Sequence, residues 1–181
     1  MSRQKGKVRV CMDRLSNNWE ESMKITVLAV GKLKERYFTE AVKEYSKRLS
    51  RYCKLEIIEV MDEKTTENAS KHEEELIRKK EGERLRKYIK EGAYVISLAI
   101  EGRQYPSEEF AEKLHKLGLH GESHIIFVIG GSIGLDPEIL KASDELLSFS
   151  KMTFPHQLMR VVLLEQIYRA YRIIHGEPYH K

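Results

Sequence analysis

The chain is poor in the residues that mark several common protein classes. Only 2 of its 181 residues are cysteine, Cys11 and Cys53, and neither belongs to a CxxC pair, so the sequence offers neither a disulfide framework nor a typical zinc site. No apolar run approaches the roughly 20 residues needed to cross a bilayer, and the basic N-terminus lacks the apolar segment of a secretory signal. We therefore expect a cytoplasmic protein with no membrane span and no bound metal.

The chain also has little net charge. Its 32 basic and 28 acidic residues leave +4, and residues 1–22, with five basic and three acidic residues, supply +2 of it. Such a small excess does not predict nucleic-acid binding, which only a local cluster of charge could indicate. The length fits a single domain with a hydrophobic core.

The first 22 residues differ in pattern from the rest of the chain. They are polar and aperiodic, whereas Met23 opens the strand-like run Met-Lys-Ile-Thr-Val-Leu-Ala-Val. The codons for Trp19, Glu20 and Glu21 must read UGG-GAR-GAR, which resembles a bacterial ribosome-binding site upstream of Met23. Our hypothesis is that the native start is Met23 and that residues 1–22 are a non-native or disordered extension. The alternative is an N-terminal arm that binds RNA.

From Met23 onward, strand and helix patterns alternate. Apolar runs predict strands at 25–30, 55–60, 94–100, 124–129 and 146–150, and helical spacing predicts helices at 37–52, 68–90 (perhaps broken near Gly82) and 155–174. Two further helices are predicted by N-caps, one starting at Ser107 and one at Asp136-Pro137. Apolar strands separated by helices indicate one α/β domain, 23–181, with a parallel sheet covered on both faces.

Ligands of open parallel sheets bind at the carboxyl ends of the strands, and three predicted ends are informative. The first is the glycine loop Gly130–Gly134, which lacks both the P-loop and the dinucleotide fingerprint and could be a structural turn. The second is the half-apolar loop Phe149–Phe154, which could form an adenine slot or simply pack Met152 and Phe154 into the core. The third, Leu98–Gly102, could form another wall of the same pocket.

Basic residues gather in two places. The segment 32–54 has eight basic residues against Glu35, Glu40 and Glu44, and the segment 151–181 has five basic residues and three histidines against Glu165 and Glu177. Both are candidates for phosphate contacts, although a solvated helix face would show the same pattern. The run Lys71–Glu75 is typical of an exposed helix face rather than of a metal site.

Three blocks of sequence resemble a known family. They are Ile129–Leu135 (IGGSIGL), Leu147–Arg160 (LSFSKMTFPHQLMR) and Pro178–Lys181 (PYHK). They resemble the SPOUT-class methyltransferases that modify N3 of a pseudouridine in 23S ribosomal RNA, and the similarity extends over Met23–Lys181. The resemblance implies an α/β knot with a threaded C-terminal segment, which binds S-adenosylmethionine in a bent shape. The implied cofactor contacts are Leu98, Gly130, Phe149, Ser150, Lys151, Met152, Thr153 and Phe154.

The resemblance also implies partners. Such proteins act as homodimers on the assembled 70S ribosome rather than on free RNA, so the second subunit would complete the pocket. A rival hypothesis is a non-catalytic ribosome-binding protein that keeps the knot as a dimerisation scaffold. The intact glycine loop and tail argue against it.

Methyl transfer to an imide nitrogen requires a group that takes its proton. Histidine suits this role near neutral pH, so His180 in the C-terminal tail is our first candidate and His156 the second. Tyr179 could stack on the base or bond to it, and Arg160 or Lys181 could bind phosphate or stabilise the imide anion. Alternatively, His156 only caps its helix and Tyr179 only pins the tail.

Overall fold

The computed structural model describes residues 23–66 and 68–178 of the chain. Within these ranges, strands and helices alternate as the hydrophobic pattern predicts. The elements are β1 (Lys24–Val30), α2 (Arg36–Leu49), β2 (Lys54–Val60), α3 (Lys71–Arg86), β3 (Tyr94–Arg103), α4 (Ser107–Leu119), β4 (His124–Ile129), α5 (Pro137–Ala142), β5 (Glu145–Leu147) and α6 (His156–Ile174).

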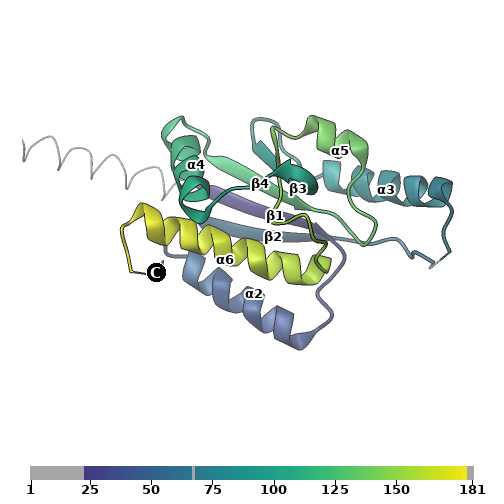
Figure 1. Cartoon of the computed structure of the whole chain (residues 1–181), viewed down its shortest axis with the longest axis horizontal. Helices are drawn as coiled ribbons and strands as arrows, with labels where there is room; N and C mark the ends of the chain where they lie inside the picture. Colours follow the sequence, from purple (N-terminus) through teal and green to yellow (C-terminus); the bar gives the residue numbers. More distant parts are fainter. Residues whose placement is uncertain (1–22, 67, 179–181) are drawn as a thin grey trace, which may run out of the picture.

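The five strands form one parallel sheet in the order β2-β1-β4-β3-β5 (Figure 1). Residues of α2, α4 and α6 share one core cluster with the sheet, and residues of α3 and α5 share a second cluster, so helices cover both faces. Strand β1 explains how the two clusters form. Ile25 and Val27 point into the first cluster and Leu28 and Val30 into the second, because successive side chains of a strand alternate between faces.

Helix α3 is continuous, so the predicted break at Gly82 is wrong. A capping box between Ser70 and Glu73 starts the helix, and Gly82 is buried inside it. A Cβ at Gly82 would lie 2.7 Å from the Cβ of Asp136, which caps α5 through the amide of Glu138. Gly82 therefore permits close packing of α3 against the start of α5 and does not interrupt the helix.

Several predicted boundaries also shift. Ser107 is the first residue of α4 rather than its cap, and its hydroxyl bonds to the side chain of Gln166 at 3.2 Å. Strand β3 continues to Arg103, beyond the predicted end at Ile100, and β5 is limited to Glu145–Leu147. Strand β3 is longer because its last residues continue to pair with β5.

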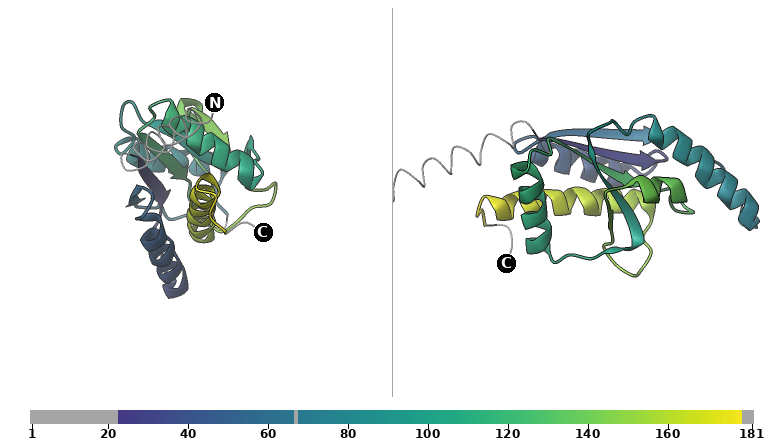
Figure 2. Two further views of the ribbon diagram at one scale, coloured as in Figure 1. Left: turned by 90° about the vertical axis from the view of Figure 1, so that its left-hand side faces the viewer. Right: turned by 90° about the horizontal axis from the view of Figure 1, so that it is seen from above.

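Helix α6 runs along the sheet from the end where α3 and α5 lie to the opposite end (Figures 1 and 2). Its first residue therefore lies near the carboxyl ends of the parallel strands and its last residue near their amino ends. Among residues 23–66 and 68–178, no helix combines the length and apolarity that a bilayer crossing requires. The hypothesis about residues 1–22 lies outside the described part of the chain.

Candidate functional site

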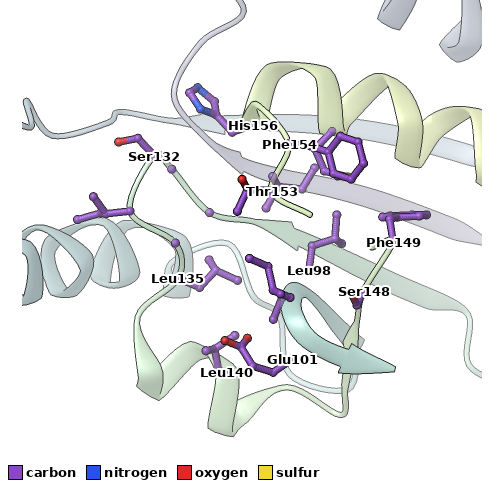
Figure 3. Close-up of a pocket in the computed structure, with 18 of the residues that line it drawn as sticks. Leu98, Glu101, Ser132, Leu135, Leu140, Ser148, Phe149, Thr153, Phe154 and His156 are labelled. Atoms are coloured by element: carbon purple, nitrogen blue, oxygen red, sulfur yellow. The ribbon is translucent and has the colours of Figure 1, made fainter. Parts of the chain in front are cut away.

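The three predicted strand ends meet around one cavity of about 670 Å³ (Figure 3). They meet because β4, β3 and β5 are neighbours in the sheet and parallel, which brings their carboxyl ends to one edge. The wall is made by residues 98–101, 129–135, 147–150 and 152–154, with Glu74, Arg78, Pro137, Leu140, His156 and Met159. This volume lies within the range of about 300–1,000 Å³ that is typical of small-molecule sites.

Seven of the eight predicted cofactor contacts line this cavity: Leu98, Gly130, Phe149, Ser150, Met152, Thr153 and Phe154. The eighth, Lys151, is exposed and is not part of the wall. Met152 and Phe154 are 72% and 41% exposed, so the alternative that they only pack into the core is wrong. The two side chains instead present apolar surface at the cavity.

The glycine loop is built for close backbone approach. A Cβ at Gly130 would lie 2.8 Å from the carbonyl carbon of Gly134, and Gly134 has a φ of +86°, which side chains rarely adopt. Gly131 and Gly134 pair across the loop, with the Gly134 amide donating to the Gly131 carbonyl at 3.2 Å. The loop is therefore a tight turn whose wall toward the cavity is largely main chain.

The end of β3 curls around β5 and closes another side of the cavity. Both Leu98 and Arg103 pair with Leu147, and the Ser148 amide donates to the Arg103 carbonyl at 2.9 Å. Gly102 makes this possible, because a Cβ there would lie 2.6 Å from the carbonyl carbons of Leu146 and Leu147. The segment 98–103 thus wraps around the strand that leads into the 149–154 loop.

His156 is the first residue of α6, at the edge of the cavity, and Pro155 holds the N-cap position. The His156 side chain makes no capping hydrogen bond to another described residue, which argues against the alternative that it merely caps the helix. Its ring lies beside the turn at Gly31 and Asp62, since a Cβ on Gly31 would be 3.6 Å from Nε2. Burial and then the nearby Arg160 cation lower the pKa of His156, while Asp62 opposes this shift. The imidazole is therefore neutral at physiological pH and able to accept a proton.

Arg160 does not reach the cavity. Its side chain is 1% exposed, ion-paired to Glu59 at 2.5 Å, and donates to the carbonyls of Val30 and Gly31 at 2.9 and 2.6 Å. Burial lowers the pKa of this guanidinium, and the Glu59 carboxylate opposes the shift. A side chain bonded in this way is not placed to hold an RNA phosphate or an imide anion, so the structure corrects the role predicted for Arg160.

Two charged side chains in the cavity wall, those of Glu101 and Arg78, were not among the predicted cofactor contacts. The Glu101 carboxylate lies beside Leu140 in the wall (Figure 3), and the described part of the chain gives it no ion pair. Arg78 of α3 donates to the carbonyl of Ile133 in the glycine loop at 3.3 Å and lies 3.7 Å from Glu74. Glu101 lies within the predicted third strand end, Leu98–Gly102, which was expected to contribute small and apolar residues to the wall rather than a carboxylate. Arg78 was not predicted, because α3 comes from a distant part of the sequence.

The buried carboxyl group of Glu81 lies against Gly131 of the glycine loop. Glu81 of α3 is 4% exposed and accepts the amide of Glu63 at 3.0 Å, while its Oε2 has no hydrogen-bond partner among the described residues. Burial raises the pKa of this carboxyl, although the Glu63 amide opposes the shift. A Cβ on Gly131 would lie 3.1 Å from Oε2, so Gly131 leaves room for this carboxyl.

The basic cluster at 32–54 is partly neutralised. Glu40 and Glu44 pair with Arg36 and Arg48 on α2, whereas the lysines of the cluster have no ion pair in the described chain. These exposed lysines are Lys32, Lys34, Lys43, Lys47 and Lys54. The tail residues Tyr179, His180 and Lys181 lie outside the described residues.

Comparison with known proteins agrees with this architecture. A family model described as a predicted SPOUT methyltransferase matches residues 23–180. The chain is 67% identical over 159 residues to a protein of Bifidobacterium adolescentis and 60% identical to one of Clostridium kluyveri, each named ribosomal RNA large subunit methyltransferase H. Each alignment covers 88% of this chain and 100% of the relative.

A solved structure shares the fold at low sequence identity. It is a probable methylase family protein from Haemophilus influenzae, 14% identical, with a TM-score of 0.50 over 89% of this chain and 71% of that one. This likeness concerns the fold alone. The match over residues 23–180 and the identity to two full-length relatives show that the chain belongs to the SPOUT methyltransferase family.

Proposed function

We propose that this protein transfers the methyl group of S-adenosylmethionine to N3 of a pseudouridine in 23S ribosomal RNA. The observation that carries the proposal is the single cavity formed by the ends of β3, β4 and β5. The names of the 60–67% identical relatives support ribosomal RNA as the substrate. The choice of N3 of a pseudouridine rests on the resemblance of the three sequence blocks.

The cavity fits the chemistry of this cofactor. Adenine needs apolar faces with main-chain donors and acceptors, which the exposed Met152 and Phe154 and the glycine loop offer. S-adenosylmethionine carries positive charge at its sulfonium and ammonium groups, and the wall offers the Glu101 carboxylate, which has no ion pair within residues 23–66 and 68–178. We further propose that the segment after β5 is threaded through the loop of residues 98–103, which the wrapping of that loop around Leu147 supports.

The chain's own residues supply positioning and a proton acceptor. S-adenosylmethionine, when bound, supplies the methyl group that its sulfonium activates. The cavity wall would have to hold the acceptor nitrogen in line with that methyl group, and such positioning would account for most of the expected acceleration. Neutral His156 stands at the edge of the cavity, and His180 of the tail is the other candidate to take the N3 proton.

The length of α6 supports a tail that acts on a second subunit. Helix α6 has 19 residues and is therefore about 28 Å long, with its first turn in the cavity wall. The three residues from 178 to 180 span at most about 11 Å, which is too short to bring His180 back to the cavity of its own subunit. We therefore propose a homodimer in which His180 of one copy completes the cavity of the other.

The proposed RNA contact is the lysine-rich surface of α2 and its flanking loops. Lys34 lies close to the cavity, since its amide donates to the side chain of Gln157 in the first turn of α6 at 2.8 Å. Lysines without ion pairs are well suited to phosphate contacts. An enzyme that acts on the assembled 70S ribosome works in the cytoplasm, and we propose this location here.

The test is methylation of ribosomes that lack the modification. Purified protein and S-adenosylmethionine are added to 70S ribosomes, to separated 50S subunits and to free 23S RNA, and the product is mapped by mass spectrometry. We expect a gain of one methyl group on a pseudouridine, with 70S ribosomes as the best substrate. If only free 23S RNA were methylated, the assembled ribosome would not be the substrate.

Thermal melting distinguishes the enzyme hypothesis from the hypothesis of a non-catalytic scaffold. A ligand at 100 times its Kd raises the free energy of unfolding by roughly 2.7 kcal/mol. We therefore expect the melting temperature to rise with S-adenosylmethionine concentration. An unchanged melting temperature together with ribosome binding would favour the scaffold hypothesis.

A further inference from the structure

A cluster of polar side chains holds Glu177 at the far end of α6 from the cavity. The Tyr52 hydroxyl donates to Oε2 of Glu177 at 2.6 Å, Arg172 forms an ion pair with the same oxygen, and Arg51 lies 3.4 Å from Oε1. We call Arg51, Tyr52, Arg172 and Glu177 the tail anchor. It immediately precedes the last residues of the chain.

The anchor is not needed to end the helix. The Gly176 amide donates to Ile173 at 3.0 Å and the Glu177 amide to Arg172 at 2.9 Å, with Gly176 at a φ of +64°. These two bonds form a Schellman motif, which terminates α6 with main-chain atoms alone. The side-chain contacts of Glu177 are additional, and their effect is to fix the direction in which the chain leaves the helix.

Tyr52 gives the anchor a rigid base. Its ring is 4% exposed and stacks on Tyr171 with centroids 5.4 Å apart and planes at 13°, and it also contacts His175 at 5.1 Å. The hydrogen bond from Tyr52 lowers the pKa of the Glu177 carboxyl, with help from Arg172 and Arg51. Glu177 is therefore a carboxylate at physiological pH, held between a buried phenol and two cations.

We propose that Glu177 and Tyr52 are positioning residues that set the exit point of the tail, so that Tyr179 and His180 reach the cavity of a second copy. This inference rests on the proposed function, in which the tail acts between subunits. Only Pro178 separates Glu177 from Tyr179, so a change of direction at Glu177 is carried directly to the tail. A displacement of about 1 Å can cost about 100-fold in rate.

The experiment compares Glu177→Gln and Tyr52→Phe with a matched control, Glu112→Gln, which breaks the exposed ion pair to Lys116 on α4, away from the proposed RNA contact. We expect the two anchor variants to lower kcat on 70S ribosomes by about 10- to 100-fold. Calorimetric affinity for S-adenosylmethionine should stay within about twofold of the wild type, because the cavity lies at the other end of α6. Glu177→Asp, which keeps the charge, should recover part of the loss, and Glu112→Gln should behave as wild type.

A second measurement follows the tail itself. Carboxypeptidase should release Lys181 and His180 faster from the anchor variants than from Glu112→Gln, since a free chain end is a better substrate. Wild-type kcat and release rates in Glu177→Gln would overturn the inference, as would a loss of cofactor affinity in parallel with kcat. His180→Ala serves as the reference. If His180→Ala leaves kcat unchanged, the proposed role of the tail fails. If kcat falls in His180→Ala but not in Glu177→Gln, only the role of the tail anchor is rejected.

Discussion

The guanidinium of Arg160 and the carboxylate of Glu59 form an ion pair, 2.5 Å long, between α6 and the end of β2. Arg160 also donates to the last carbonyls of β1 and the following turn, so it joins the start of α6 to two strand ends. Glu59 in turn accepts the Leu33 amide at 3.0 Å. This arrangement fixes the helix turn that carries His156 and Met159 against the cavity.

Arg160→Leu should therefore act on stability. Removal of one partner of a buried ion pair costs roughly 3–5 kcal/mol, and we expect about 3 kcal/mol here because Glu59 remains partly exposed. Denaturant unfolding measures the change. Glu59→Gln, which keeps an acceptor, should cost less. Unchanged stability with lost turnover would restore the role in substrate binding that the sequence predicted.

Glu81→Gln should stabilise the protein at alkaline pH. Burial raises the pKa of Glu81, so its contribution to stability is fully present below the unfolded value of about 4.3 and is lost as pH rises through the folded value. Glutamine stays neutral, and we expect a gain of about 1 kcal/mol at pH 8 and none at pH 4. Thermal melts of both proteins between pH 4 and pH 8 measure the difference in stability. An equal effect of Glu81→Gln at both pH values would contradict a raised pKa of Glu81.

Glu101→Gln should reduce the preference for S-adenosylmethionine over S-adenosylhomocysteine, because only the former carries the sulfonium charge. Two opposite unit charges about 8 Å apart, at an effective dielectric constant near 40, attract each other by about 1 kcal/mol, or about fivefold in affinity, and we expect an effect of this order. Calorimetry with both ligands measures the ratio of the two affinities. Glu91→Gln, in the turn before β3, is the control. Equal losses for both ligands would place Glu101 away from the sulfonium.

His180→Ala should lower turnover on ribosomes and leave cofactor affinity intact. Loss of a general base typically costs about 100- to 10,000-fold. His156→Gln is the matched comparison, and the variant that loses more turnover at constant affinity identifies the base. Equal loss of turnover and of cofactor affinity in His180→Ala would discredit it in this role.

A mixing experiment tests whether the tail acts between subunits. Thr153→Tyr fills the cavity from an exposed wall position and leaves the tail unchanged. Mixed dimers of Thr153→Tyr with His180→Ala contain one intact cavity facing one intact tail. We expect such mixtures to regain up to about a quarter of wild-type activity, if subunits exchange at random and each intact pair works alone. No recovery after demonstrated subunit exchange would mean that the tail serves its own subunit.

The sequence by itself determined the elements and the class of fold. Apolar runs at 25–30 and 124–129 could be recognised as buried strands because both of their faces are covered, and the glycine loop after Ile129 marked a site because glycine permits close approach. The wall formed by Leu98, Gly130 and the 149–154 loop was predicted by resemblance, with Lys151 as the exception.

Only the tertiary structure decided which residues, distant in the sequence, contact one another. Arg160 reads as a surface cation in the sequence, and its burial depends on Glu59, 101 positions away. Glu177 reads as an ordinary tail residue, yet it is held by Tyr52, 125 positions away. Periodicity reports which face of an element is apolar, since that is a local property. The partner of a buried charge is set by strand order and helix packing, which no local pattern encodes.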